Sequence, residues 1–146
     1  MKKVLIVYAS RTGKTKAMAE YLAEGLRMAG CQADVKKIAD IDKGEQMAGY
    51  DGYLFGCPTY HKDITDGMKK FLFKAKMAAL DGKWGGAFGS HTHSGESPVI
   101  IYETMQYVCK MKMTDLGPLR LTEAMIGTSE GTKACQEYGK AFGGKL

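Results

Sequence analysis

The sequence lacks the patterns that mark several common classes of protein. Its four cysteines, Cys31, Cys57, Cys109 and Cys135, form no C-x-x-C pair and no Cys/His cluster with finger-like spacing. The apolar run at residues 4–9 is far too short for a membrane span or for the core of a signal peptide. We therefore expect reduced thiols, no structural metal, no membrane-spanning segment and a cytoplasmic location.

Clustered charge is also missing. The net charge is +5 and the pI is about 8.9, but the lysines are scattered, with no basic run and no basic stripe interleaved with aromatic side chains. We interpret the excess lysine as a solvated surface and expect no nucleic-acid partner. Repeats, low-complexity tracts and long linkers are absent as well. A chain of 146 residues fits one domain, which residues 1–146 are expected to form.

What the chain contains is an alternation of short apolar runs with segments of helical period. Strands are predicted at residues 4–8, 33–38, 53–55 and 84–89, and an edge strand interrupted by Gly117-Pro118 is predicted within residues 113–121. Apolar stripes predict helices around residues 18–29, 68–79, 101–108 and 134–142, the first ended by Gly30. This alternation predicts an α/β fold: a five-stranded parallel sheet with helices on both faces, in three layers.

The segment Ser10-Arg11-Thr12-Gly13-Lys14-Thr15 follows the first predicted strand and opens directly into a helix. Its three hydroxyls, its glycine and the free N–H groups of a helix start together favour binding of an anion. The end of this segment matches a nucleotide P-loop, but Tyr8 stands where that motif requires its first glycine, and no acidic residue follows residues 53–55 to hold magnesium. A plain helix N-cap without a ligand is the remaining alternative.

Three loops together resemble those of the flavodoxin family. The S-R-T-G-K-T segment is similar to the family's phosphate loop, and Gly56-Cys57-Pro58-Thr59-Tyr60 is similar to the segment that touches the isoalloxazine ring. Phe88-Gly89-Ser90 followed by Ser94-Gly95-Glu96 is similar to the third flavin loop. In detail the chain looks closest to the flavodoxin module of flavodiiron proteins. The resemblance implies strand order 2-1-3-4-5, of which flavodoxin is itself the standard example, with flavin mononucleotide (FMN) at the switch point.

The resemblance assigns a role to each loop. It implies that the first loop holds the phosphate, that the second lines the flavin with Tyr60 as the best stacking residue, and that the third wraps the pyrimidine side. The implied FMN-binding residues are Ser10, Arg11, Thr12, Gly13, Lys14, Thr15, Pro58, Thr59, Tyr60, His61, Ser90, His91, Thr92, His93, Ser94 and Gly95. The alternative for Tyr60 is a surface tyrosine at a turn.

The chain departs from the family pattern in two respects. Many flavodoxins are acidic whereas this chain is basic, and His91-Thr92-His93 stands where many have an aromatic residue. A metal site at this H-x-H pair lacks a third ligand nearby in the sequence. We expect His91 or His93 to face the flavin and to make its reduction potential less negative, increasingly so below about pH 6.5.

Two neighbouring residues leave further alternatives open. Cys57 beside the flavin loop is either a thiol redox partner or, as we favour, a small buried residue after a strand. Glu96 is a candidate cap for a helix that is expected to begin near Ser97-Pro98.

The expected function is that of a non-enzymatic electron carrier without catalytic residues, working as a monomer or weak dimer with redox partner proteins, either a ferredoxin-like donor or an oxidoreductase acceptor. The main alternative is a small FMN-dependent NAD(P)H:quinone-type reductase. A module that kept the fold but lost the cofactor is disfavoured by the intact first loop. A phosphate-accepting receiver needs acidic residues where Ala9-Ser10 and Gly56-Cys57 stand.

Overall fold

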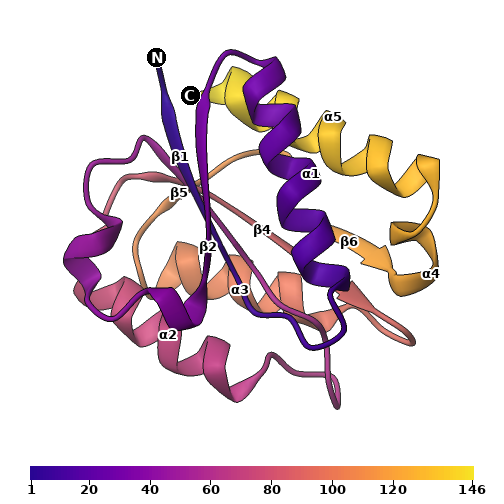
Figure 1. Ribbon diagram of the computed structural model, residues 1–146. Helices are drawn as coiled ribbons and strands as arrows, with labels where there is room; N and C mark the ends of the chain where they lie inside the picture. Colours follow the sequence, from indigo (N-terminus) through magenta and orange to yellow (C-terminus); the bar gives the residue numbers. More distant parts are fainter.

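A parallel sheet forms the middle layer of the computed structural model, which describes all of residues 1–146 (Figure 1). Its strands are β1 (Lys3–Tyr8), β2 (Gln32–Lys37), β3 (Gly52–Gly56), β4 (Trp84–His91), β5 (Lys112–Met113) and β6 (Leu119–Thr122). The order is β2-β1-β3-β4, and both β5 and β6 pair with β4. The first residues of β4 pair with β5, and its last residues pair with β6. The predicted order 2-1-3-4-5 is confirmed, with the fifth position interrupted at Gly117-Pro118 as predicted.

Helices cover both faces of the sheet (Figure 1). The helices α1 (Lys14–Met28) and α5 (Ser129–Lys145) lie side by side over one face, whereas α2 (Asp66–Met77) and α3 (Glu96–Tyr107) lie over the other. The predicted three-layer α/β sandwich is therefore confirmed. The short helix α4 (Glu123–Ile126) and the 3-10 turns η1 (Ile38–Asp40) and η2 (Gly44–Met47) were not predicted, because one turn is too short to show a helical period.

Two predicted helix ends were wrong by a residue or two. Ala79 lies beyond α2 with a left-handed φ of 57°, and Val108 is the exposed C-cap of α3 rather than part of its buried stripe. In both cases the prediction extended the apolar repeat of the helix beyond its last helical residue. The end of the first helix is as predicted, because Gly30 takes a left-handed φ of 84° and its N–H donates to the carbonyl of Arg27.

The apolar run of β1 is buried on both faces of the sheet, as a central parallel strand requires. Leu5 and Val7 pack with the side chains of α2 and α3, whereas Val4 and Ile6 pack with those of α1 and α5. The end of β1, and with it the loop that leads into α1, therefore lies between the carboxyl ends of β2 and β3.

The helices α1 and α5 approach closely at two glycines. A methyl group on Gly139 would lie 2.2 Å from the carbonyl oxygen of Leu22, and one on Gly25 would lie 2.0 Å from that of Gln136. These contacts are with backbone atoms, which cannot move without displacing a helix.

We expect Gly139→Ala to lower the free energy of unfolding by about 1–3 kcal/mol, although alanine favours helix over glycine by about 1 kcal/mol. The matched variant Gly144→Ala in the same helix meets no atom within 4 Å, so its stability should stay equal or rise. Urea unfolding followed by circular dichroism measures both. Equal stability of the two variants would show that this close packing is not required.

Candidate functional site

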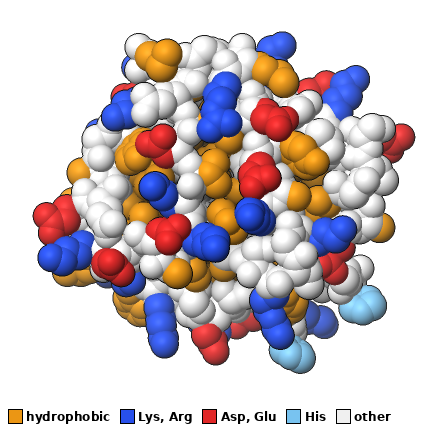
Figure 2. Space-filling view, in the orientation of Figure 1, with side chains coloured by type: hydrophobic (Ala, Val, Ile, Leu, Met, Phe, Trp, Pro, Cys, Tyr) orange, Lys and Arg blue, Asp and Glu red, His pale blue; other side chains and the backbone are white.

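Three loops meet at the carboxyl ends of the central strands, where β1 leads to a helix on one face of the sheet and β3 to a helix on the other. We call them the first loop (residues 9–13), the second loop (residues 57–65) and the third loop (residues 92–95). All three histidines of the chain lie in or next to the second and third loops. The histidines visible in Figure 2 lie together at the lower right, where these loops protrude in Figure 1.

The first loop leaves the start of α1 open to a ligand. Gly13 takes a left-handed φ of 88°, and its N–H donates to the Ser10 hydroxyl oxygen at 3.0 Å. No side chain caps α1, and no acidic residue stands in its first turn. The backbone donors of this turn, the hydroxyls of Ser10 and Thr12 and the half-buried Lys14 therefore form a site suited to an anion.

A buried pair of hydroxyls joins the start of α1 to the end of β4. The side chains of Thr15 and Ser90 are hydrogen-bonded at 2.8 Å, and both residues are buried. Ser90 thus lies beneath the loops, and its hydroxyl is already partnered within the protein. The pair fixes the spacing between the first and third loops.

The second and third loops enclose a pocket of about 430 Å³ with part of the first. Seven of the predicted FMN-binding residues line it, together with Lys62, which was not predicted: Arg11, Thr59, Tyr60, His61, Thr92, His93 and Ser94. Two permanent cations and two histidines stand in this lining, and no carboxylate does. The charge of this lining suits a ligand that carries or acquires negative charge.

The tip of the second loop is a tight turn from Tyr60 to Asp63. The two residues exchange both backbone hydrogen bonds, at 3.0 and 2.9 Å, and His61 and Lys62 between them have left-handed φ values of 52° and 61°. Two positive φ angles define a type I′ turn, which ordinarily takes Asn or Gly. This turn brings the side chains of His61 and Lys62 to the lining of the pocket.

Arg11 links the first loop to the second. Its guanidinium carbon lies 5.0 Å from the centroid of the Tyr60 ring, within the range of a cation–π contact. Tyr60 is half-buried, and Arg11 is the side chain that contacts its ring. Tyr60 also lines the pocket, and its stacking on a flavin stays a prediction.

Hydrogen bonds tie the second loop to the start of α3. The Thr59 N–H donates to the Ser90 carbonyl at 3.0 Å, and the Thr59 hydroxyl oxygen accepts the Ser97 N–H at 3.0 Å. The Ser97 hydroxyl in turn donates to the Cys57 carbonyl at 2.9 Å. The side chain of Thr59 therefore joins the second loop to α3, and Pro58 beside it is buried.

The two histidines of the third loop region differ in position. His93 lines the pocket, whereas His91 is half-buried and its ring packs against Gly95, whose missing side chain leaves room for it. Glu96 begins α3, close to the predicted start, and Gly95 is its N-cap. The pKa of the Glu96 carboxyl is held below its ordinary value, chiefly by the Ser94 hydroxyl, with Lys62 and His91 contributing, so it stays ionised at neutral pH.

The structure adds two residues that sequence reasoning missed. Lys62 follows His61 directly, but only the left-handed turn brings its side chain to the pocket. Glu123, from α4, accepts a hydrogen bond from the Thr12 hydroxyl at 3.2 Å. No sequence signal links Thr12 to Glu123, which are 111 positions apart.

Cys57 is completely buried, and burial raises the pKa of its thiol to about 11 against smaller opposing effects of Thr65 and Ser97. Since the folded-state pKa lies above the ordinary value, the thiol stays protonated at pH 8. We expect Cys57 to resist alkylation by iodoacetamide at pH 8 until the protein is unfolded, as measured by mass spectrometry of its peptide. Rapid native-state labelling would revive the thiol redox role.

No group of three or more His, Cys, Asp or Glu side chains is arranged to hold a metal ion. None of the helices combines the length and the apolar character needed to span a bilayer.

Known proteins are similar to this chain in sequence and in fold. The family model described as Flavodoxin matches residues 6–137. A flavodoxin of Clostridium saccharobutylicum is 30% identical over 73% of this chain and 67% of its own length. An NAD(P)H dehydrogenase (quinone) of a Bradyrhizobium strain is 33% identical over 80% of this chain and 71% of its own length.

Among solved structures, a flavodoxin from the domain Archaea is 28% identical, has a TM-score of 0.87 and aligns over 98% of this chain and 97% of its own. The flavodiiron protein of Giardia intestinalis is 23% identical with a TM-score of 0.86, and 99% of this chain covers 36% of that protein. The second likeness concerns the fold, and it agrees with the predicted resemblance to a flavodiiron module.

Proposed function

This chain belongs to the flavodoxin family, and from that premise we propose that it binds FMN and transfers electrons between redox partner proteins. The observation that carries the proposal is the uncapped start of α1, with its hydroxyls and Lys14, next to a pocket without carboxylates. We further propose that residues 1–146 form the one domain that holds the cofactor.

The donor set fits FMN at both ends. Ser10, Thr12 and the backbone of the first turn of α1 would hold the phosphate dianion. For this the Thr12 hydroxyl has to break its hydrogen bond to Glu123. Tyr60 and His93 would flank the isoalloxazine, and the pocket volume lies within the range of small-molecule sites. Bound FMN supplies transfer of one or two electrons; the protein positions the ring, excludes water from it and sets the local charge.

The NAD(P)H dehydrogenase (quinone) relatives support a second candidate, a small FMN-dependent reductase. Against it, the loops that line the pocket are short, and no further element of this chain adds a wall for a nicotinamide cofactor. We therefore favour the carrier, with a ferredoxin-like donor or an oxidoreductase acceptor as its partner.

Anaerobic mixing of the FMN-loaded protein with NADH or NADPH distinguishes the two candidates. A carrier should keep its oxidised absorption spectrum for minutes and then be bleached at once by dithionite. Bleaching by NADH or NADPH within seconds would establish the reductase instead. Failure to take up FMN at all would remove both.

A further inference from the structure

The face formed by α2 and α3 exposes large apolar side chains that no part of the chain covers. Four of the six large hydrophobic residues that stand exposed lie on these two helices or at their ends: Phe73, Met77, Tyr107 and Val108, at 72%, 82%, 65% and 46% exposure. The other two, Met1 and Met28, lie elsewhere on the chain. An apolar set gathered in this way marks an interaction surface more often than scattered single residues do.

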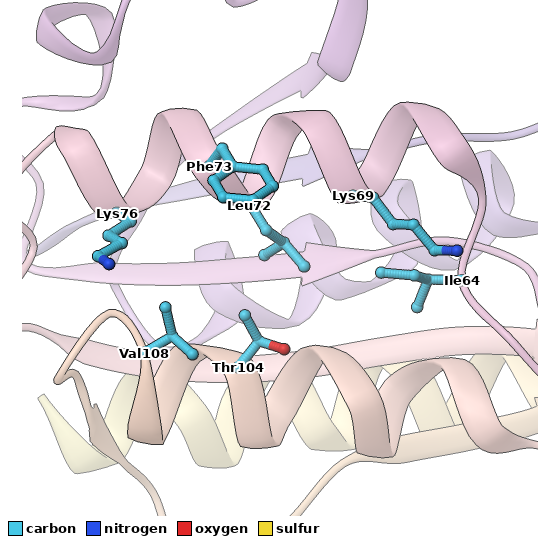
Figure 3. Close-up of a pocket in the computed structure, with 7 residues that line it drawn as sticks. All are labelled: Ile64, Lys69, Leu72, Phe73, Lys76, Thr104 and Val108. Carbon is cyan, nitrogen blue, oxygen red and sulfur yellow. The ribbon is translucent and has the colours of Figure 1, made fainter.

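A groove runs between the two helices (Figure 3). Leu72 and Ile64 form part of its apolar lining; Phe73 stands on the α2 side, and Thr104 and Val108 on the α3 side. Its volume is about 270 Å³, and a second hollow that shares Lys76 and Val108 extends it past Tyr107. Within α2, Lys69, Phe73 and Lys76 lie on one stripe because they are three and four residues apart. We call this surface the α2–α3 groove.

Positive charge borders the groove. Lys69, Lys76 and Lys110 line it and its extension, against the single carboxylate of Asp81. Lys69 is already paired with Asp63 at 2.8 Å, but Lys76 and Lys110 form no ion pair. The groove thus offers an apolar floor with two free ammonium groups beside it.

We propose that the α2–α3 groove docks an acidic amphipathic helix of a partner protein. The apolar face of such a helix covers Phe73 and Val108, and its carboxylates meet Lys76 and Lys110. The part of α2 that lines the groove, Lys69 to Lys76, spans about 10 Å, which matches about two turns of a docked helix. Because Lys69 borders both this groove and the second loop through Asp63, a partner held here is anchored beside the pocket without covering it.

Docking in the α2–α3 groove does not depend on FMN. Ile64 of the second loop borders the groove, but none of the residues that line the groove also lines the pocket. Failure of FMN binding and failure of groove docking are therefore separate results.

The test uses ¹⁵N-labelled full-length protein, loaded with FMN if it takes it up, and a synthetic 18-residue peptide. The peptide carries leucines at positions i, i+3, i+4 and i+7 of each repeat and glutamates on its polar face; its control carries lysines in place of the glutamates. We expect amide shifts at α2 and α3 with the acidic peptide and at least tenfold weaker binding of the basic one. Added salt should lower the affinity of the protein for the acidic peptide.

Variants assign the contact. The double variant Lys76→Glu, Lys110→Glu should weaken binding of the acidic peptide at least tenfold. Phe73→Ser should weaken it to the same extent without changing the charge of the groove. Lys140→Glu on α5 and Met28→Ser on α1 are matched exposed controls and should change nothing. The proposal would be overturned by equal binding of the two peptides or by amide shifts that lie away from α2 and α3. It would also be overturned if the chain alone forms a dimer that Phe73→Ser dissociates, because the groove would then bind a second copy.

Discussion

Replacing Ser10 and Thr12 together by alanine is expected to weaken FMN binding by about 100-fold or more. In the proposed complex each hydroxyl donates to the phosphate dianion. A hydrogen bond to a charged group is worth about 1.5–3 kcal/mol, so two removed bonds amount to about 3–6 kcal/mol. Both residues stand outside the buried core, so the fold should tolerate the change. Quenching of FMN fluorescence on titration with protein measures the dissociation constant.

The control for this variant is Ser129→Ala, which removes an exposed hydroxyl from the start of α5 instead. It should bind FMN as the parent does. If the double variant also binds FMN unchanged, the first loop does not hold the phosphate, and the assignment of the site is wrong.

The second large effect concerns the reduction potential. Arg11 and Lys62 line the pocket without a carboxylate among its other lining residues, and full reduction of FMN leaves negative charge on the ring. Replacing both by glutamine should make the two-electron potential of bound FMN more negative by about 20–50 mV, since about 30 mV corresponds to 1.4 kcal/mol for two electrons. The ionised Glu96 nearby and the exposure of both cations keep the effect in this range.

Spectroelectrochemical titration of the parent and the double variant at low ionic strength provides the measurement. Lys140→Gln on α5 removes one remote charge and should leave the potential unchanged. Potentials that agree within error in parent and double variant would mean that the charge of the pocket lining does not act on the flavin. His93→Ala, measured at several pH values, tests the histidine hypothesis in the same way.

The sheet could be predicted from the sequence because its strands are buried on both faces. Runs such as residues 4–8 and 53–55 are continuously apolar, and such runs separated by helical stripes leave few other arrangements. The short elements could not be predicted, because α4 and the 3-10 turns hold too few residues for a period to be seen. The predicted helix end at Ala79 was wrong, because the spacing of apolar residues does not show where the backbone takes a left-handed φ.

The candidate site was predictable where it depends on one loop at a time. The uncapped glycine and hydroxyls before α1 are visible in the sequence, as is the histidine pair of the third loop. Contacts between loops were not visible: Thr15 with Ser90, Thr12 with Glu123, and Arg11 with Tyr60 join residues that only the topology brings together. Nor could the sequence show that His93, rather than His91, lines the pocket.

The proposed function depends on recognition of a phosphate at the start of α1, and a comparison of FMN with riboflavin tests this recognition most directly. The two ligands share the isoalloxazine and ribityl groups and differ only in the phosphate. Calorimetric titration of the purified protein at neutral pH should give micromolar or tighter binding of FMN and binding of riboflavin at least about 100-fold weaker. Equal affinity for the two, or no heat and no fluorescence quenching with FMN, would contradict it.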